Sequence, residues 1–384
     1  MERAPLSLRG ARRSLPFLLL GYSIVHFVLS SGLMDPIKNI GGDFNAGFPN
    51  FWAWTINPKM IEENGLVQRW MGPKEIFLSP HSCEEGGWVR PPPVCDDFDA
   101  AGYMDVGARY HTYKNQTWLY GPVMHFLTFP LLYMPNFFSA LRVWHTLLCL
   151  LFLLAGVIWY RMLFDGQGGL WSFVLFAALW LNFMPLYQAL HGAEIEVLKF
   201  FLMTLVIHFA LRRQDALSGL ALGLSIMTKF LPGIFLPYFI LKKRYRIVGV
   251  SLLTIFIVGV MAEIFLGWRW NYTFRIVRDG GIGPTWLHSH SLSTWVHRWF
   301  THVDFFRDSI ISINSPVPTH PVLAGAIALV LRYSLVFLYG TFFWIGRARE
   351  VRLSEIGILA LLMIVLPPWD HIHYHIFFLI GYAV

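Results

Sequence analysis

An acidic residue stands close behind the first long apolar stretch of the chain. Asp43 lies in Gly41-Gly42-Asp43-Phe44, nine residues after that stretch ends at Met34. A carboxylate at the mouth of a membrane cavity can act as a general base, because partial burial raises its pKa toward the working pH. The alternative is an ordinary solvated loop acid, since Asp is mostly exposed in proteins. Asp43 is therefore a candidate catalytic base.

Three ionisable residues lie at the start of another apolar stretch. Glu194, Glu196 and Lys199 open the run 195–211. Ionisable groups at the membrane end of a helix are costly unless they face a cavity or a partner. Glu196 and Lys199 are three residues apart and can pair on one helical face. A structural ion pair and a role in binding substrate are both compatible with this spacing.

A single lysine separates two short apolar stretches. Lys229 lies in Met227-Thr228-Lys229-Phe230-Leu231-Pro232. Its side chain can reach for the membrane interface while its stem stays in apolar surroundings. It can also neutralise a lipid phosphate held where the helix breaks. Both interpretations fit the pattern.

Two further clusters have partial metal-site spacing. His371 and His375, in Trp369-Asp370-His371-Ile372-His373-Tyr374-His375, are four apart and can share one helical face. A zincin motif would also have a Glu between the two histidines, and this segment has none, so an interfacial histidine cluster is favoured over a metal site. A third interpretation is that His371 binds substrate or phosphate. Asp96-Asp97-Phe98-Asp99 resembles a metal-binding Asp-x-Asp, but the acids around it favour a solvated charge run. We predict no metal and no cofactor.

The composition limits the class of protein that can carry these residues. Of 384 residues, 55% are hydrophobic and 14% charged, whereas soluble proteins have roughly 45–50% and about 25%. This excludes a soluble globular domain and a disordered chain. The net charge of +7 does not indicate a nucleic-acid partner, because the basic residues fall between apolar runs as topology signals do. The sequence predicts an all-α polytopic membrane protein embedded in the lipid bilayer.

Apolar runs mark the expected helices. Pro16–Met34 follows four arginines and is expected to be an uncleaved first helix, and the proline-broken Tyr120–Met134 a re-entrant segment or one short helix. Further runs cover 139–160, 170–187, 195–211, 216–228, 231–241, 247–266, 321–345, 353–366 and 371–384. The last run reaches Val384 without a basic residue after it, which is compatible with a longer natural chain.

The basic residues predict the orientation. We take 120–134 as a re-entrant segment, which begins and ends on the same side of the membrane. The basic residues that then share one side are Arg3, Arg9, Arg12, Arg13, Arg161, Arg212, Arg213, Lys242, Lys243, Arg244, Arg246, Arg347, Arg349 and Arg352. Basic residues collect on the cytoplasmic side, so we expect a cytoplasmic N-terminus and outer loops at 35–119 and 267–320. Cys83 and Cys95 share the first loop, where a disulfide and two free thiols are both compatible with the sequence.

Several of these segments, taken in order, resemble glycosyltransferase family 87 of the GT-C superfamily. The matching pieces are Gly42-Asp43-Phe44, Tyr120-Gly121-Pro122, Gly219-Leu220-Ala221-Leu222-Gly223-Leu224, Lys229-Phe230-Leu231-Pro232, the basic residues 242–246, and Trp369-Asp370-His371. The resemblance implies a GT-C-like helical bundle with a long outer first loop, forming a single transmembrane domain over residues 1–384. Family members transfer mannose or a related sugar from a polyprenyl-phosphate carrier.

The resemblance also implies roles for particular residues. Asp43 would be the catalytic base, and Lys229 and His371 would lie near the donor phosphate or the acceptor. We also expect Asp370 and Glu194 to bind substrate. The family often has Gly-Gln-x-Asn where this chain has His191-Gly192-Ala193-Glu194, and two adjacent histidines where it has His371-Ile372. These differences concern the sugar and the acceptor more than the reaction class.

The sequence thus predicts an inverting membrane glycosyltransferase. It would move a sugar, mannose by the resemblance, from a polyprenyl-phosphate-linked donor to a hydroxyl of a glycan or glycolipid acceptor on the outer face. The alternative is a transporter or flippase of polyprenyl-linked substrates, which would share the cavity, cations and aromatics but not need Asp43. A structural membrane subunit is disfavoured by the many polar residues on one face.

Overall fold

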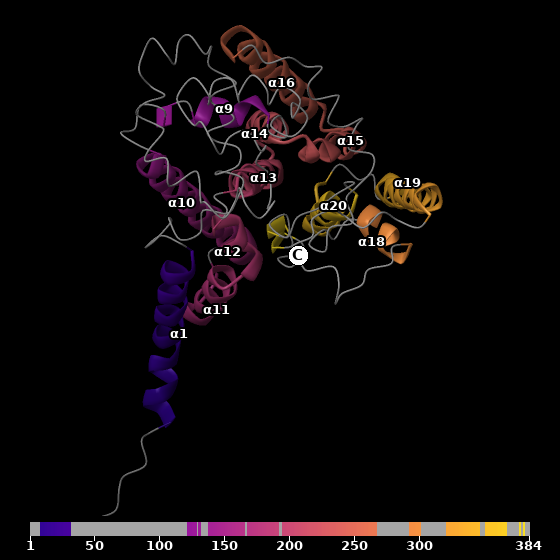
Figure 1. Ribbon diagram of the computed structural model, residues 1–384. Helices are drawn as coiled ribbons and strands as arrows, with labels where there is room; N and C mark the ends of the chain where they lie inside the picture. Colours follow the sequence, from indigo (N-terminus) through magenta and orange to yellow (C-terminus); the bar gives the residue numbers. More distant parts are fainter. Residues whose placement is uncertain are drawn as a thin grey trace, which may run out of the picture.

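The computed structural model describes residues 8–31, 121–128, 130–131, 137–165, 167–191, 194–266, 292–300, 320–345, 350–366, 376–377 and 379–380. All regular structure in these ranges is helical (Figure 1). The helices are α1 (Leu8–Ser30), α9 (Pro122–Thr128), α10 (Phe137–Phe164), α11 (Leu170–Leu181), α12 (Met184–His191), α13 (Glu196–Leu211), α14 (Asp215–Thr228), the 3-10 helix η4 (Leu231–Ile234), α15 (Phe235–Leu241), α16 (Tyr245–Leu266), α18 (Leu292–Trp299), α19 (Pro321–Ile345) and α20 (Leu353–Val365).

Three of these helices are long and apolar enough to cross a bilayer. They contain the segments Arg142–Phe164, Tyr245–Phe265 and Val322–Ile345. Large apolar side chains on them face outward, among them Phe337, which is 74% exposed, and Phe265, which is 69% exposed. Such exposure suits a lipid surround and not water. The protein is therefore an all-α membrane protein, as its composition predicted.

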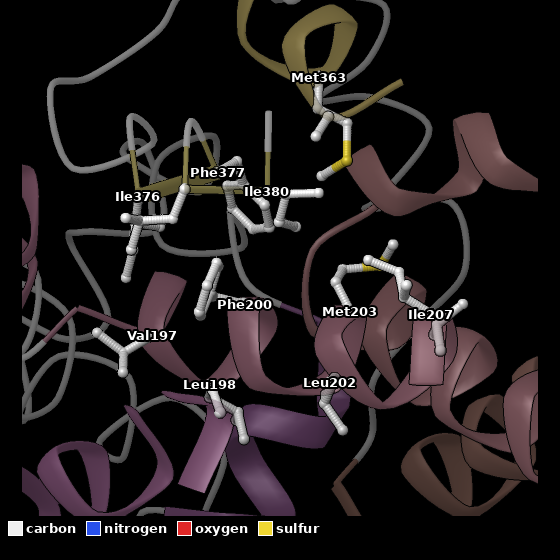
Figure 2. Close-up of a cluster of buried hydrophobic side chains, with 14 of the residues drawn as sticks. Val197, Leu198, Phe200, Leu202, Met203, Ile207, Met363, Ile376, Phe377 and Ile380 are labelled. Atoms are coloured by element: carbon white, nitrogen blue, oxygen red, sulfur yellow. The ribbon is translucent and has the colours of Figure 1, made fainter. Parts of the chain in front are cut away.

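The core is organised around α13. Its buried side chains include Phe200 and Met203, and Figure 2 shows Phe200 pointing toward Phe377 of the C-terminal segment. On another side α13 packs on α10, where Trp159 Nε1 donates to Thr204 Oγ1 at 3.0 Å. Further toward the start of both helices, the rings of Phe152 and Phe200 pack together. Residue numbers increase in the same direction along the two helices, so α10 and α13 run parallel.

A tight turn reverses the chain from α13 into α14. The N–H of Arg213 donates to the carbonyl of Ala210, and the N–H of Gln214 donates to that of Phe209. This is the Schellman pattern, in which one residue after the helix takes a left-handed conformation. Arg213 does so at φ 59, although glycine is usual there. Lys243 repeats the arrangement between α15 and α16 at φ 57.

Two glycines let α14 and α16 approach closely. A Cβ on Gly219 would lie 2.5 Å from the carbonyl oxygen of Ile247, and one on Gly223 would lie 2.6 Å from Cβ of Thr254. Ser251 Oγ donates to the carbonyl of Gly219 at 3.0 Å across the contact. Small residues four apart with an interhelical hydrogen bond are a common way to join membrane helices. The Gly-Leu-Ala-Leu-Gly segment is thus a packing surface.

The predicted helix over 170–187 is wrong in one respect, because the chain breaks at Asn182–Phe183 into α11 and α12. Pro185 explains the break, since it has no N–H to offer the carbonyl of Leu181 and its ring clashes there. The hydroxyl of Tyr187 donates to that carbonyl instead. Tyr187 also holds α1 in place, because its Oη lies 2.9 Å from Nδ1 of His26. Figure 1 shows the rest of α1 extending away from the other helices.

Other predicted segments meet the structure in part. The proline-broken segment 120–134 contains the short helix α9, and one short helix was one of its two interpretations. The run 231–241 consists of η4 and α15. Within the predicted outer loop 267–320 lies α18, which the sequence analysis missed and which packs on α19. Most of 371–384 and all of 35–119 lie outside the described residues. The single domain over 1–384 stays a prediction.

Candidate functional site

The chain changes direction at the end of α14, and Lys229 lies at that point. Its backbone is extended, with φ −161 and ψ 129, between α14 and η4. Pro232 explains why α14 stops, because it cannot donate to the carbonyl of Thr228 four residues earlier. That carbonyl accepts the N–H of Gly121 at 2.8 Å instead. The helix break is therefore completed by a segment distant in sequence.

Gly121 fits this place because it lacks a side chain. Its Cα approaches α14 so closely that a Cβ would overlap the carbonyl oxygen of Met227. A neighbouring backbone atom cannot swing away as a flexible side chain can, so any larger residue would push the two segments apart. Gly121 of one predicted motif thus lies against the end of α14, directly before the second motif, Lys229-Phe230-Leu231-Pro232.

Lys229 is held by a carboxylate from α13, the helix that precedes α14. Its Nζ donates to Glu196 Oε1 at 2.7 Å. Glu196 also forms an ion pair with Lys199, one turn further along α13. Glu196 and Lys199 are 0% exposed, whereas the Lys229 side chain is 15% exposed. We call these three residues the Glu196 cluster.

The hairpin geometry explains why these residues meet. α13 has 16 residues and α14 has 14, so the two arms measure about 24 Å and about 21 Å from their shared turn. Glu196 starts the first arm and Lys229 follows the end of the second. Antiparallel arms of nearly equal length bring these two residues to one level. Both arms are shorter than the roughly 30 Å apolar thickness of a bilayer.

The C-terminal segment reaches the same cluster. Lys199 Nζ lies 4.9 Å from the ring centroid of Phe377, a cation–π distance. The Phe377 ring also packs edge-on against Phe200, with ring centroids 5.9 Å apart. The segment that directly follows Asp370 and His371 in sequence is thereby anchored beside the Glu196 cluster.

The predicted site residues are only partly within the described structure. Lys229 is in the cluster, and Glu194 is buried at 5% exposure two residues before the start of α13. Asp43, Asp370 and His371 lie outside the described residues, as do Asp96, Asp97, Asp99 and His375. The part of the chain that is described contains no group of three His, Cys, Asp or Glu able to hold a metal ion.

The sequence analysis considered Glu196 and Lys199 but did not select them as site residues. Their spacing correctly indicated the ion pair within α13. It carried no signal for the second contact, between Glu196 and Lys229, because these residues are far apart in sequence. Gly121 and Phe377 were not singled out for the site either. The tight backbone contact of Gly121 leaves no trace in sequence beyond the glycine itself.

A second buried ionic cluster lies at the opposite end of the same helices. Lys242 Nζ lies 2.7 Å from Glu355 Oε1, and Tyr238 donates its hydroxyl to Glu355 Oε2 at 2.8 Å. Beside it Arg244 Nε donates to both carboxylate oxygens of Asp215 at 3.1 Å. These contacts tie the start of α14 and of α20 to the turn between α15 and α16. Their place among helix ends indicates a structural role.

The fold and the Glu196 cluster define a membrane protein with ionisable groups gathered at a helix break. Such groups inside a membrane protein indicate function by default, because burying them is costly. The sequence model of glycosyltransferase family 87 matches residues 118–368. The match covers well over half of the chain, so the protein belongs to this family and is a glycosyltransferase.

The matched region contains the whole of the Glu196 cluster, and Phe377, the aromatic neighbour of the cluster, lies after it. Asp43 lies before it, and Asp370 and His371 lie shortly after it. No match was found among curated proteins or among solved structures.

Proposed function

We propose that this glycosyltransferase takes its sugar, mannose by resemblance, from a polyprenyl-phosphate carrier. The acceptor would be a hydroxyl of a glycan or glycolipid on the outer face of the membrane. Family membership supports the transfer of a sugar. The membrane fold supports a lipid-linked donor, because such a molecule reaches the site sideways through the bilayer.

The observation that carries the proposal is the position of Lys229. It lies where α14 breaks, and it is the most exposed of the three residues in the Glu196 cluster. Its ammonium group is positively charged and partly exposed, so a phosphate that approaches it is attracted. Its location at a break within short helices suits a phosphate held just below a membrane surface.

The proposed reaction is a displacement at the anomeric carbon. Asp43 takes the proton of the acceptor hydroxyl, and the oxygen attacks the carbon on the face opposite the phosphate. The bond between that carbon and the phosphate oxygen breaks, and its electron pair leaves with the lipid phosphate, whose charge Lys229 stabilises. The configuration at the carbon inverts. Glu194, Asp370 and His371 are proposed to contact donor or acceptor.

The proposal places the protein in the membrane as a multi-pass enzyme with a cytoplasmic N-terminus. Support comes from the basic turns after α13 and α15, which the pairing of Arg244 with Asp215 brings to one end of the helices. Basic residues favour the cytoplasmic side. The Glu196 cluster, at the opposite end, would then face outward.

Donor consumption tests the proposed function. Purified protein in liposomes is given radiolabelled polyprenyl-phosphate-mannose together with glycan and glycolipid acceptors. An enzyme converts the label to a product with an inverted linkage. Movement of intact donor between leaflets without consumption would establish the transporter instead and overturn the proposal.

Replacing Lys229 tests its part in donor binding. Lys229→Met should raise the donor KM about 10- to 100-fold, because a charge-assisted hydrogen bond contributes about 1.5–3 kcal/mol. The matched control is Lys242→Met, which removes a buried lysine that also lies 2.7 Å from a carboxylate. It should lower stability and leave the donor KM unchanged. Equal KM values in Lys229→Met and the unsubstituted protein would remove Lys229 from the donor site.

Replacing Asp43 tests the proposed base. Asn has nearly the same shape as Asp but cannot take a proton at neutral pH. Asp43→Asn should therefore lower kcat by about 10²–10⁴-fold, the usual contribution of general-base catalysis. Donor binding by the folded variant, measured in parallel, should persist. Near-normal turnover in folded Asp43→Asn would contradict this role.

A further inference from the structure

We propose that Glu196 and Lys199 are positioning residues, which act on the donor through Lys229. The inference rests on the proposed function, in which Lys229 binds the donor phosphate. It adds that the ammonium of Lys229 is aimed by a buried carboxylate, and that this carboxylate is held in turn by Lys199. The ligand that the arrangement serves is a lipid-linked phosphate anion.

The first step is the geometry of Glu196. Its two carboxylate oxygens serve different lysines, with Oε1 accepting from Lys229 at 2.7 Å and Oε2 paired with Lys199. Lys229 follows the end of α14, whereas the other two residues lie in the first turn of α13. The carboxylate therefore connects two helices. It also fixes where the end of a long and flexible lysine side chain lies.

The second step is the difference in burial. Glu196 and Lys199 are fully buried, so their side chains have little freedom to move. Lys229 keeps 15% of its side chain exposed, so a ligand can approach its ammonium group. The contact with Glu196 restrains the position of that ammonium. The buried pair thus orients the exposed cation.

The third step is the role of Lys199. A buried carboxylate requires compensation of its charge, and Lys199 provides it from within the same helix. Glu196 can therefore stay ionised while Lys229 also binds a phosphate. The ring of Phe377, 4.9 Å from Lys199 Nζ, gives Lys199 a second favourable contact. The order of contacts runs from Phe377 through Lys199 and Glu196 to Lys229.

A double-mutant cycle tests whether Glu196 acts through Lys229. Donor KM and kcat are measured for the unsubstituted protein, Glu196→Gln, Lys229→Met and the double variant, with polyprenyl-phosphate-mannose as donor. Glu196→Gln alone should raise the donor KM about tenfold, as expected for coupled neighbours, and change kcat less. In the Lys229→Met background the same replacement should change the KM no further.

Matched controls separate positioning from folding. Glu355→Gln alters another buried carboxylate, one that contacts Lys242 at 2.7 Å and Tyr238 at 2.8 Å. It should lower thermal stability and leave the donor KM unchanged. Phe377→Leu keeps every charge of the cluster and removes only the ring beneath Lys199. It should raise the donor KM about two- to threefold, again only when Lys229 is present, so the test remains decisive if Glu196→Gln does not fold.

Three results would overturn the inference. One is an unchanged KM in folded Glu196→Gln, or in Phe377→Leu where Glu196→Gln does not fold. Another is a lowered KM, which would show that the carboxylate competes with the phosphate for Lys229. The third is an equal rise of KM with and without Lys229. Failure of the proposed function is distinct, because the unsubstituted protein would then consume no donor. Failure of the Lys229 assignment is also distinct, because Lys229→Met itself would then leave the donor KM unchanged.

Discussion

At the scale of single residues, two lysines have similar partners and different assignments. Lys229 and Lys242 each lie 2.7 Å from a glutamate carboxylate, and each follows a short helix. Their exposure separates them, because the Lys229 side chain is 15% exposed and that of Lys242 is 0% exposed. An ammonium without access to its surroundings cannot bind a ligand. This is why we assign binding to Lys229 and a structural role to Lys242.

We expect loss of Lys242 alone to destabilise the protein, and loss of Lys242 together with Glu355 to destabilise it much less. Lys242→Met leaves a buried carboxylate without its cation and should cost about 3–5 kcal/mol. Adding Glu355→Leu to that variant should recover most of the loss, because the uncompensated charge is gone. Chemical denaturation in detergent measures both variants. A double variant as unstable as the single one would contradict this account.

At the scale of elements, proline residues decide where two apolar runs are interrupted. Pro185 and Pro232 each leave a helix carbonyl without its usual N–H, those of Leu181 and Thr228. The hydroxyl of Tyr187 satisfies the first, and the backbone of Gly121 satisfies the second. Buried backbone groups need such partners. Each break is therefore stabilised by a contact that the local sequence does not contain.

The contact between α14 and α16 leads to a prediction for Gly223. A Cβ there would lie 2.6 Å from Cβ of Thr254 and 2.8 Å from the carbonyl oxygen of Ser251. Gly223→Ala should therefore destabilise the protein by about 1–3 kcal/mol, since the helices must separate. The measurement is the thermal unfolding temperature in detergent.

Gly249 offers a matched control on the partner helix. Among the described residues, no atom outside the adjacent backbone of α16 lies within 4 Å of the place that its Cβ would take. Gly249→Ala should leave the unfolding temperature unchanged or raise it slightly, because Ala is favoured over Gly within helices. Equal losses in the Gly223 and Gly249 variants would show that close packing is not the cause.

At the scale of the whole molecule, the basic residues gather at one end of the helices. The turn containing Arg213 and the turn containing Lys243 are joined by the pairing of Arg244 with Asp215. Lys242 binds Glu355, so the start of α20 lies there too. The parallel course of α10 and α13 brings Arg161 toward the same end. For these described residues the grouping assumed from charge alone is matched in space, and the side of the membrane on which they lie stays a prediction.

Thiol labelling tests on which side of the membrane this end lies. In a background with Cys83, Cys95 and Cys149 replaced, a cysteine is introduced at Lys243 or at Lys114, with the protein in a cell's surface membrane. An impermeant reagent should label Lys114→Cys in intact cells, and Lys243→Cys only after permeabilisation, because basic turns stay cytoplasmic. The reverse pattern would contradict the proposed orientation.

The sequence alone determined the class of protein and most of its helices. Apolar runs are a local property, and a backbone surrounded by lipid has to satisfy its own hydrogen bonds, so such runs become helices. Pro232 and Lys229 likewise marked a break that the structure contains. The ion pair between Glu196 and Lys199 was foreseen because residues three apart share one face of a helix.

Only the tertiary structure decided which of these residues work together. The contact of Glu196 with Lys229 depends on the lengths of two helices and on the turn between them. The contacts of Gly121 with Thr228 and of Phe377 with Lys199 join segments that no periodicity relates. Such meetings arise from packing of the whole chain, because each is fixed by how several helices fit side by side and not by the residues next to it in sequence.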